Sequence, residues 1–180
     1  MARWSLALVV PVVVAVVAGC GSVPAGPPDP FPPRPQAIDI ERLDPCALLT
    51  PEQQEARNVG SGQAGSAVLD GATTRACSWV SIDSPLSYAA QLIPQSAVGA
   101  SGEPGTIDGY GSVRVADRVD TYPRCDVLLD VNDDQLIRIQ VEAQTRPSPG
   151  DQRSYPVAEV CAAAEKTASD VLRSARRATP

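Results

Sequence analysis

The sequence predicts an α+β domain, an antiparallel sheet of about five strands covered on one face by a short N-terminal helix and a long C-terminal helix and cross-linked by two disulfides. Three observations predict this fold. Apolar and polar residues alternate over 125–131 and 136–143, as in strands with one solvated face. Apolar residues recur at helical spacing over 157–175. Four cysteines remain when Cys20 is set aside, an even number that suits two disulfides.

The first twenty residues resemble a bacterial lipoprotein signal peptide. Arg3 gives a positive start, and the apolar stretch Leu6–Ala18 is shorter than the roughly 20 residues that a membrane-spanning helix needs. Val17-Ala18-Gly19-Cys20 has the form of a lipobox, in which the cysteine carries diacylglycerol and begins the mature protein. Ordinary secretion, with cleavage after small residues, is the alternative. We expect residues 1–19 to be a lipoprotein signal peptide and Cys20 to be lipidated, which places the protein on the outer face of the cytoplasmic membrane, facing the cell wall.

A proline-rich segment follows the lipidation site. Seven prolines lie between Gly21 and Ile38, and such a segment tends toward polyproline II. Fully extended, it would form a spacer of roughly 50 Å. We therefore expect residues 20–38 to be a lipidated cysteine and a tether, and residues 39–180 to be a single extracytoplasmic domain with one hydrophobic core.

The domain is predicted to begin with a short helix. Asp44-Pro45 favours a turn, and Thr50-Pro51-Glu52-Gln53 supplies an N-cap, a first-turn proline and a capping-box partner. Asn58 and Gly60 offer a stop, and residues 60–75 are expected to be a loop because small residues dominate them. The last two predicted strands form a hairpin across residues 132–135. Strands are expected at 77–82, 88–93, 112–119, 125–131 and 136–143.

The C-terminal helix is expected to cover the apolar face of the sheet. Cys161 lies on the apolar stripe of that helix, and Cys125 lies on the apolar face of strand 125–131. In an up-and-down meander these two cysteines lie at the same end of the sheet. This argument favours Cys125–Cys161 and leaves Cys46–Cys77. The nested pairing, Cys46–Cys161 with Cys77–Cys125, stays open because the strand order is assumed.

Several short motifs together resemble a known family. They are Asp44-Pro45-Cys46-x-Leu-Leu, Cys77-Ser78-Trp79, the hairpin that opens at Cys125 and the final helix at Cys161. This set resembles an uncharacterised actinobacterial lipoprotein family (domain of unknown function 3558), whose mycobacterial members include LprB-like lipoproteins. The resemblance implies an actinobacterial source and an anchored, disulfide-linked α+β domain. It implies no catalytic residues, because none are established for the family.

The sequence contains no recognisable catalytic, cofactor or metal site, so we do not expect an enzyme. The chain has no histidine, no nucleophile elbow and no phosphate loop. Gly109-Tyr110-Gly111 suits a turn or bulge better than a nucleotide site. Asp130, Asp133 and Asp134 suit a turn better than a calcium loop. Trp79 is expected in the core, packed against a disulfide.

These observations leave a binding role as the expected function. The formal net charge is −6 and the arginines are dispersed, so there is no basic stripe for nucleic acid. We expect a membrane-anchored, noncatalytic binding or accessory module at the cell envelope, held by lipidated Cys20 and directed at an unknown envelope protein or small ligand. The alternative is a carrier of a small apolar or lipidic ligand in a cavity between sheet and helices. The polar side of the sheet, which either recognises a partner or is simply solvated, is predicted to carry Arg114, Arg118, Arg138, Gln140 and Glu142.

Overall fold

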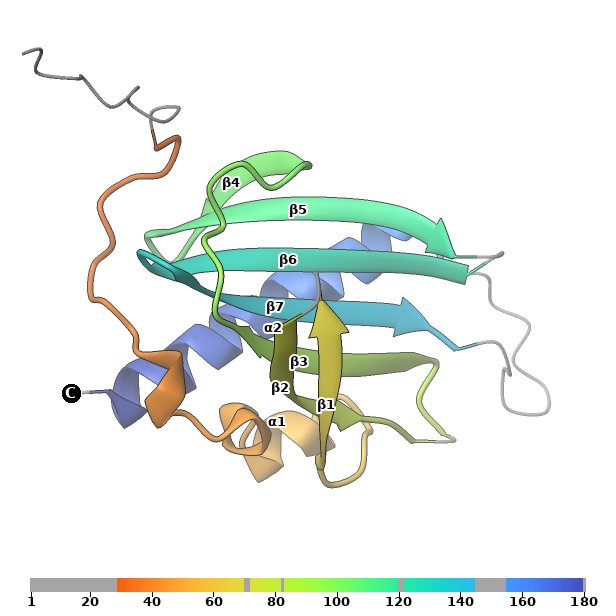
Figure 1. Cartoon of the computed structure of the whole chain (residues 1–180). Helices are drawn as coiled ribbons and strands as arrows, with labels where there is room; N and C mark the ends of the chain where they lie inside the picture. Colours follow the sequence, from red (N-terminus) through yellow and green to blue (C-terminus); the bar gives the residue numbers. More distant parts are fainter. Residues whose placement is uncertain (1–28, 70–71, 82, 120–121, 145–154, 180) are drawn as a thin grey trace, which may run out of the picture.

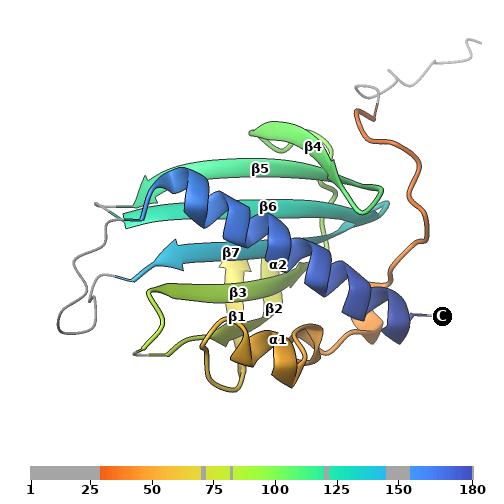
Figure 2. The same cartoon turned by 180° about the vertical axis from the view of Figure 1, so that it is seen from behind.

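A single antiparallel sheet and one long helix make up most of the molecule. The computed structural model describes residues 29–69, 72–81, 83–119, 122–144 and 155–179. Within them, the helix α2 (Val157–Ala178) lies diagonally across one face of the sheet (Figure 1, Figure 2). The sheet has seven strands: β1 (Gln63–Leu69), β2 (Ala72–Trp79), β3 (Leu86–Ile93), β4 (Glu103–Ile107), β5 (Tyr110–Val119), β6 (Tyr122–Asn132) and β7 (Gln135–Ala143).

The strand order explains why one loop crosses the sheet. The order is β1-β2-β3-β7-β6-β5-β4, so two meanders meet where β3 pairs with β7. The connection from β3 to β4 must therefore pass β7, β6 and β5, and Figure 1 shows residues 94–102 crossing in front of them, on the face opposite α2. Under this loop Ile93, Ala97 and Leu136 form a small buried cluster, against which Phe31 and Leu128 pack.

The predicted fold class is wrong in its element count. The sequence predicts about five strands and two covering helices, whereas the described residues form seven strands and one long helix. The two strands that were not predicted, β1 and β4, are the edges of the sheet. Each pairs on one side only. Small residues and an exposed Val68 give β1 no alternation, and Pro104 and Gly105 interrupt β4, whose residues 103–106 are all exposed.

The N-terminal part of the domain forms turns in place of the predicted covering helix. Two 3-10 turns, η1 (Ile40–Arg42) and η2 (Pro45–Leu48), precede the five-residue helix α1 (Pro51–Glu55). The predicted capping box between Thr50 and Gln53 is present, but none of the residues of α1 is buried. A helix without an apolar stripe cannot cover a sheet.

The predicted hairpin and C-terminal helix are confirmed. β6 and β7 pair through Asn132 and Gln135, with a turn at Asp133-Asp134. Gly109, at φ 84°, forms the two-residue β4–β5 turn with Asp108, at φ 49°. Positive φ at both positions is typical of type I′ hairpin turns. The apolar stripe of α2 is buried against the sheet, through Val160, Cys161, Ala164, Ala168, Val171, Leu172 and Ala175.

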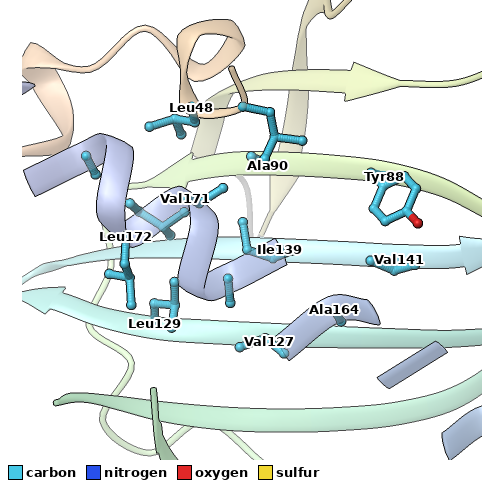
Figure 3. Packing of buried hydrophobic residues seen from close by; sticks show 14 of the residues in the cluster. Leu48, Tyr88, Ala90, Val127, Leu129, Ile139, Val141, Ala164, Val171 and Leu172 are labelled. Carbon is cyan, nitrogen blue, oxygen red and sulfur yellow. The ribbon is translucent and has the colours of Figure 1, made fainter. Parts of the chain in front are cut away.

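Two disulfides join the turns and the helix to the sheet. Cys46 of η2 bonds Cys77 of β2, and Cys125 of β6 bonds Cys161 of α2. These are the pairs that the meander argument favours over the nested alternative. Trp79 is fully buried, two residues after Cys77, as expected for a core residue. Figure 3 shows the centre of this core, where Val127, Leu129, Ile139 and Val141 face Ala164, Val171 and Leu172 of α2.

Candidate functional site

The face of the sheet opposite α2 carries an organised set of polar side chains. Along β6 and β7, residues such as Val127 and Ile139 are fully buried in the core under α2. The residues between them alternate onto the other side. We call this side the open face. Its polar residues include Gln91 of β3, Arg124 and Asp126 of β6, and Arg138, Gln140 and Glu142 of β7.

Asp126 is the centre of the charge network on the open face. Its Oδ2 accepts a hydrogen bond from Arg138 at 2.7 Å and lies 3.6 Å from Nε of Arg124. Arg138 also donates to Oε1 of Gln91 at 3.4 Å. Arg124 in turn lies 3.5 Å from a carboxylate oxygen of Asp117. The network therefore connects side chains from four adjacent strands, β3, β7, β6 and β5.

Two buried atoms of this network have no hydrogen-bond partner among the described residues. They are Oδ1 of Asp126 and Nε of Arg124. The Asp126 side chain is only 7% exposed, although it lies on the face of the sheet that α2 does not cover. An unmatched buried polar group costs about 1–3 kcal/mol, and more when it is charged. The centre of the open face thus retains hydrogen-bonding capacity that the fold itself does not use.

The structure corrects one predicted member of this polar face. Arg138, Gln140 and Glu142 do lie together on the open face, but Arg114 lies on the opposite side of the sheet. Arg114 pairs across the strands with Val127, which faces the helix. Its guanidinium donates to Glu165 of α2 at 2.9 Å and to Glu103 of β4. The predicted set also contains Arg118, whose side chain lies outside the described residues.

An N-terminal contact that the sequence did not predict lies at one end of the sheet. Arg34, inside the predicted tether, binds Asp130 through Nε at 2.7 Å and through a terminal nitrogen at 2.9 Å, and it reaches Asp133 at 2.8 Å. Asp130 is 1% exposed. These hydrogen bonds raise the pKa of Arg34 above its usual value. Ile38 adds a backbone hydrogen bond to the carbonyl of Val131, at the register shift of β6.

Sequence reasoning assigned Asp130 and Asp133 to turn formation, and it missed their ion pairs because the partner, Arg34, lies almost a hundred residues away. The sequence contained one signal for this contact, the arginine among the prolines of residues 24–35. A segment that acts only as a spacer does not require a charged side chain. The segment from Phe31 to Ile38 thus contacts the sheet at several points, including the Tyr110 hydroxyl, which donates to the carbonyl of Gln36.

A cleft of about 320 Å³ lies between β3, the end of α1 and α2. Arg57 organises it, because its guanidinium contacts three elements. It donates to Asp170 of α2 at 2.5 Å, to Thr167 at 3.2 Å and to the carbonyl of Gln53 at 2.9 Å. It also lies over the ring of Tyr88, 5.7 Å from the ring centroid. Burial raises the pKa of the Tyr88 hydroxyl above its usual value. Sequence reasoning did not single out Arg57, since no local pattern brings these elements together.

The predicted lipidation site, Cys20, lies outside the described residues, as does the whole of the predicted signal peptide. In the described part of the chain, no cluster of three or more histidine, cysteine, aspartate or glutamate side chains is suited to hold a metal ion. Over the same residues, no helix has the length and hydropathy to cross a membrane.

The fold and its covalent links define this protein as a small α+β domain with two disulfides, a polar sheet face and a cleft beside α2. A model of the family described as protein of unknown function (DUF3558) matches residues 15–174, so the chain belongs to that family. No curated protein and no solved structure matched the sequence.

Proposed function

We propose that this protein is a lipid-anchored, noncatalytic binding module on the outer face of an actinobacterial cytoplasmic membrane, and that it engages an envelope protein through the open face. The lipobox ending at Cys20 supports the anchor. The disulfides support an extracytoplasmic location, because structural disulfides persist in oxidising compartments and are rare in the cytosol. A site outside the membrane, facing the cell wall, satisfies both features.

The contacts of the N-terminal segment support a defined orientation at the membrane. Arg34 and Ile38 attach this segment to the β6–β7 end of the sheet. Between Cys20 and Arg34 the chain can span at most roughly 45 Å when fully extended. An anchor at Cys20 would therefore keep the β6–β7 turn within that distance of the bilayer surface.

The single observation that carries the binding proposal is the buried carboxylate of Asp126 on the face of the sheet opposite α2. Burying a charge is unfavourable unless it is paired and hydrogen-bonded, yet Oδ1 of Asp126 has no partner among the described residues. A carboxylate oxygen can only accept hydrogen bonds. We infer a partner segment with basic or donor-rich chemistry, whose N–H groups complement the acceptor Oδ1 of Asp126.

The alternative role, a carrier of an apolar or lipidic ligand between sheet and helix, has less support. Two of the small residues of α2 that could leave room for a cavity, Ala164 and Ala168, are fully buried in the core, whereas Ala163 lines the cleft. The cleft that adjoins α2 lies at the edge of this interface and is lined by Arg57 and Lys166. Charged lining suits a ligand with a polar group better than a wholly apolar one.

Two measurements test this function in an actinobacterial host. The first compares the membrane fractions of cells that make the wild-type chain or Cys20→Ala. The variant should appear in the soluble extracytoplasmic fraction, and its retention on membranes would contradict the anchor.

The second measurement places a photoreactive residue at Gln140 on the open face or, as a control, at the exposed Ala162 on α2. A crosslinked product at Gln140 only, lost on Glu142→Arg, is expected. Equal products at both positions, or none at either, would contradict the open face as the binding surface.

A further inference from the structure

The cleft beside α2 has the size and walls of a small-molecule site. Its volume of about 320 Å³ lies at the lower end of the range for ligand pockets, roughly 300–1,000 Å³. Pro85, Leu86 and Ala163 give it apolar walls, and Tyr88 and Tyr155 add aromatic surface. The cleft therefore suits a compact ligand with an apolar or aromatic body.

Both charged side chains among the described lining residues of the cleft are cationic. They are Arg57 and Lys166, and no carboxylate is among the described residues of its lining, although the chain has 21 acidic residues. Arg57 is neutralised by Asp170. Lys166 is exposed and has no ion-pair or hydrogen-bond partner in the described part of the chain. Among the described residues of the lining, one positive charge is thus uncompensated, which matches a monoanion.

Two further groups in the cleft have unused hydrogen bonds. Arg57 donates three of its five N–H groups to protein acceptors, so two remain. Tyr88 is 7% exposed as a residue, and its hydroxyl, which solvent reaches, has no hydrogen-bond partner among the described residues. Figure 3 shows this hydroxyl pointing away from Ala90 and Ile139, at the margin of the core. A polar group of a ligand would satisfy it.

We propose that this cleft binds a small organic acid. Its carboxylate meets Lys166 and the free N–H groups of Arg57, and its apolar or aromatic body packs against Tyr88 and Leu86. Carboxylates form strong, charge-assisted hydrogen bonds with guanidinium and ammonium groups. A phosphate dianion fits less well, because a single uncompensated cation does not balance it. This inference does not rest on the open face. The cleft lies between α1 and α2, on the face of β3 that points toward the helix.

The composition of the chain supplies a direct probe of this site, because Lys166 is its only lysine. Reductive methylation of the full-length chain, purified in detergent, with ¹³C-formaldehyde labels this side chain and preserves its charge. A free α-amino group would give a second, separate signal. Titration with benzoate should shift the Lys166 methyl signal in a saturable way, and the neutral isostere benzyl alcohol should not. A linear response to benzoate, or equal responses to both compounds, would overturn the proposal.

Variants separate a local site from general attraction between charges. In calorimetric titration of the full chain, Lys166→Gln should weaken benzoate binding about tenfold or more, as expected for loss of a charge-assisted hydrogen bond. Tyr88→Phe should weaken it by a smaller factor. Arg177→Gln is the matched control, because Arg177 is an exposed cation on the same helix that does not line the cleft. A loss with Arg177→Gln as large as that with Lys166→Gln would overturn the site.

Discussion

The guanidinium of Arg34 and the carboxylate of Asp130 form a two-point ion pair between residues 96 positions apart, at 2.7 and 2.9 Å. Asp130 is almost completely buried and Arg34 is mostly so, with 1% and 18% of their side chains exposed. The pair fixes the N-terminal segment to the β6–β7 end of the sheet. Arg34 also forms an ion pair with Asp133, but the Asp133 side chain is 90% exposed, whereas that of Asp130 is buried.

Arg34→Gln should therefore destabilise the domain strongly. Removing one partner of a buried pair leaves an uncompensated charge and typically costs about 3–5 kcal/mol. Asp133→Asn is the matched control, because it removes the exposed contact of the same arginine and should cost less than about 1 kcal/mol. Urea unfolding of both variants measures the difference. Equal losses would mean that the Arg34–Asp130 pair does not hold the segment as its geometry indicates.

Replacing Gly62 by a larger residue should lower the stability of the domain, whereas replacing Gly65 should not. A Cβ added at Gly62 would lie 2.6 Å from both Sγ of Cys77 and Nε1 of Trp79, while one at Gly65 would meet nothing within 4 Å. Gly62→Ala should cost about 1–3 kcal/mol because the buried ring and disulfide must shift. Gly65→Ala should be neutral or stabilising by up to about 1 kcal/mol, since it reduces the entropy of the unfolded chain. Thermal unfolding of the two variants would refute this if both lost stability equally.

The central part of the fold was predictable from the sequence because burial there is one-sided and local. In β6, β7 and α2 the apolar residues recur with the period of the element and pack against one neighbouring layer. Their pattern therefore predicts both the type of element and the face that it buries. The edge strands β1 and β4 lack this signal. Their residues are mostly exposed on both faces, so apolar and polar residues do not need to alternate along them. The faces of two well-patterned elements favoured the pairing of Cys125 with Cys161, while the nested pairing stayed open because the strand order was assumed.

The candidate sites were much less predictable, because they depend on contacts between distant segments. Arg138, Gln140 and Glu142 could be placed on one face by alternation alone. Arg57 could not be placed in the cleft, since its partners Asp170 and Tyr88 lie on elements whose approach is set by the whole sheet order. The same holds for Arg34, whose acceptors follow it by almost a hundred residues.

Each disulfide should contribute a similar entropic stabilisation to the fold. The two bridges close loops of 31 and 36 residues, for which the chain-entropy relation gives about 4 kcal/mol each. Replacing the Cys125–Cys161 pair by alanines should cost more than replacing Cys46–Cys77, because Cys125 and Cys161 are both buried in the core while Cys46 is only partly buried. Urea unfolding of the two double variants gives the order, and a larger loss for Cys46–Cys77 would contradict it.

The buried tyrosine of the cleft should make the domain sensitive to alkaline pH. Burial raises the pKa of Tyr88 in the folded state above that of the unfolded chain, which is about 10. The contribution of this group to stability is therefore complete below about pH 10 and is lost as the pH rises toward the folded-state pKa, because the unfolded chain releases the proton first. Urea unfolding between pH 8 and 11 should show wild type losing stability faster than Tyr88→Phe over this window, and absorbance at 295 nm should show the highest-pH phenol transition reduced in the variant. Tyr110→Phe is a parallel test, because burial raises the pKa of Tyr110 as well. Identical alkaline profiles for wild type and Tyr88→Phe would mean that the cleft leaves this hydroxyl as accessible to water as in the unfolded chain.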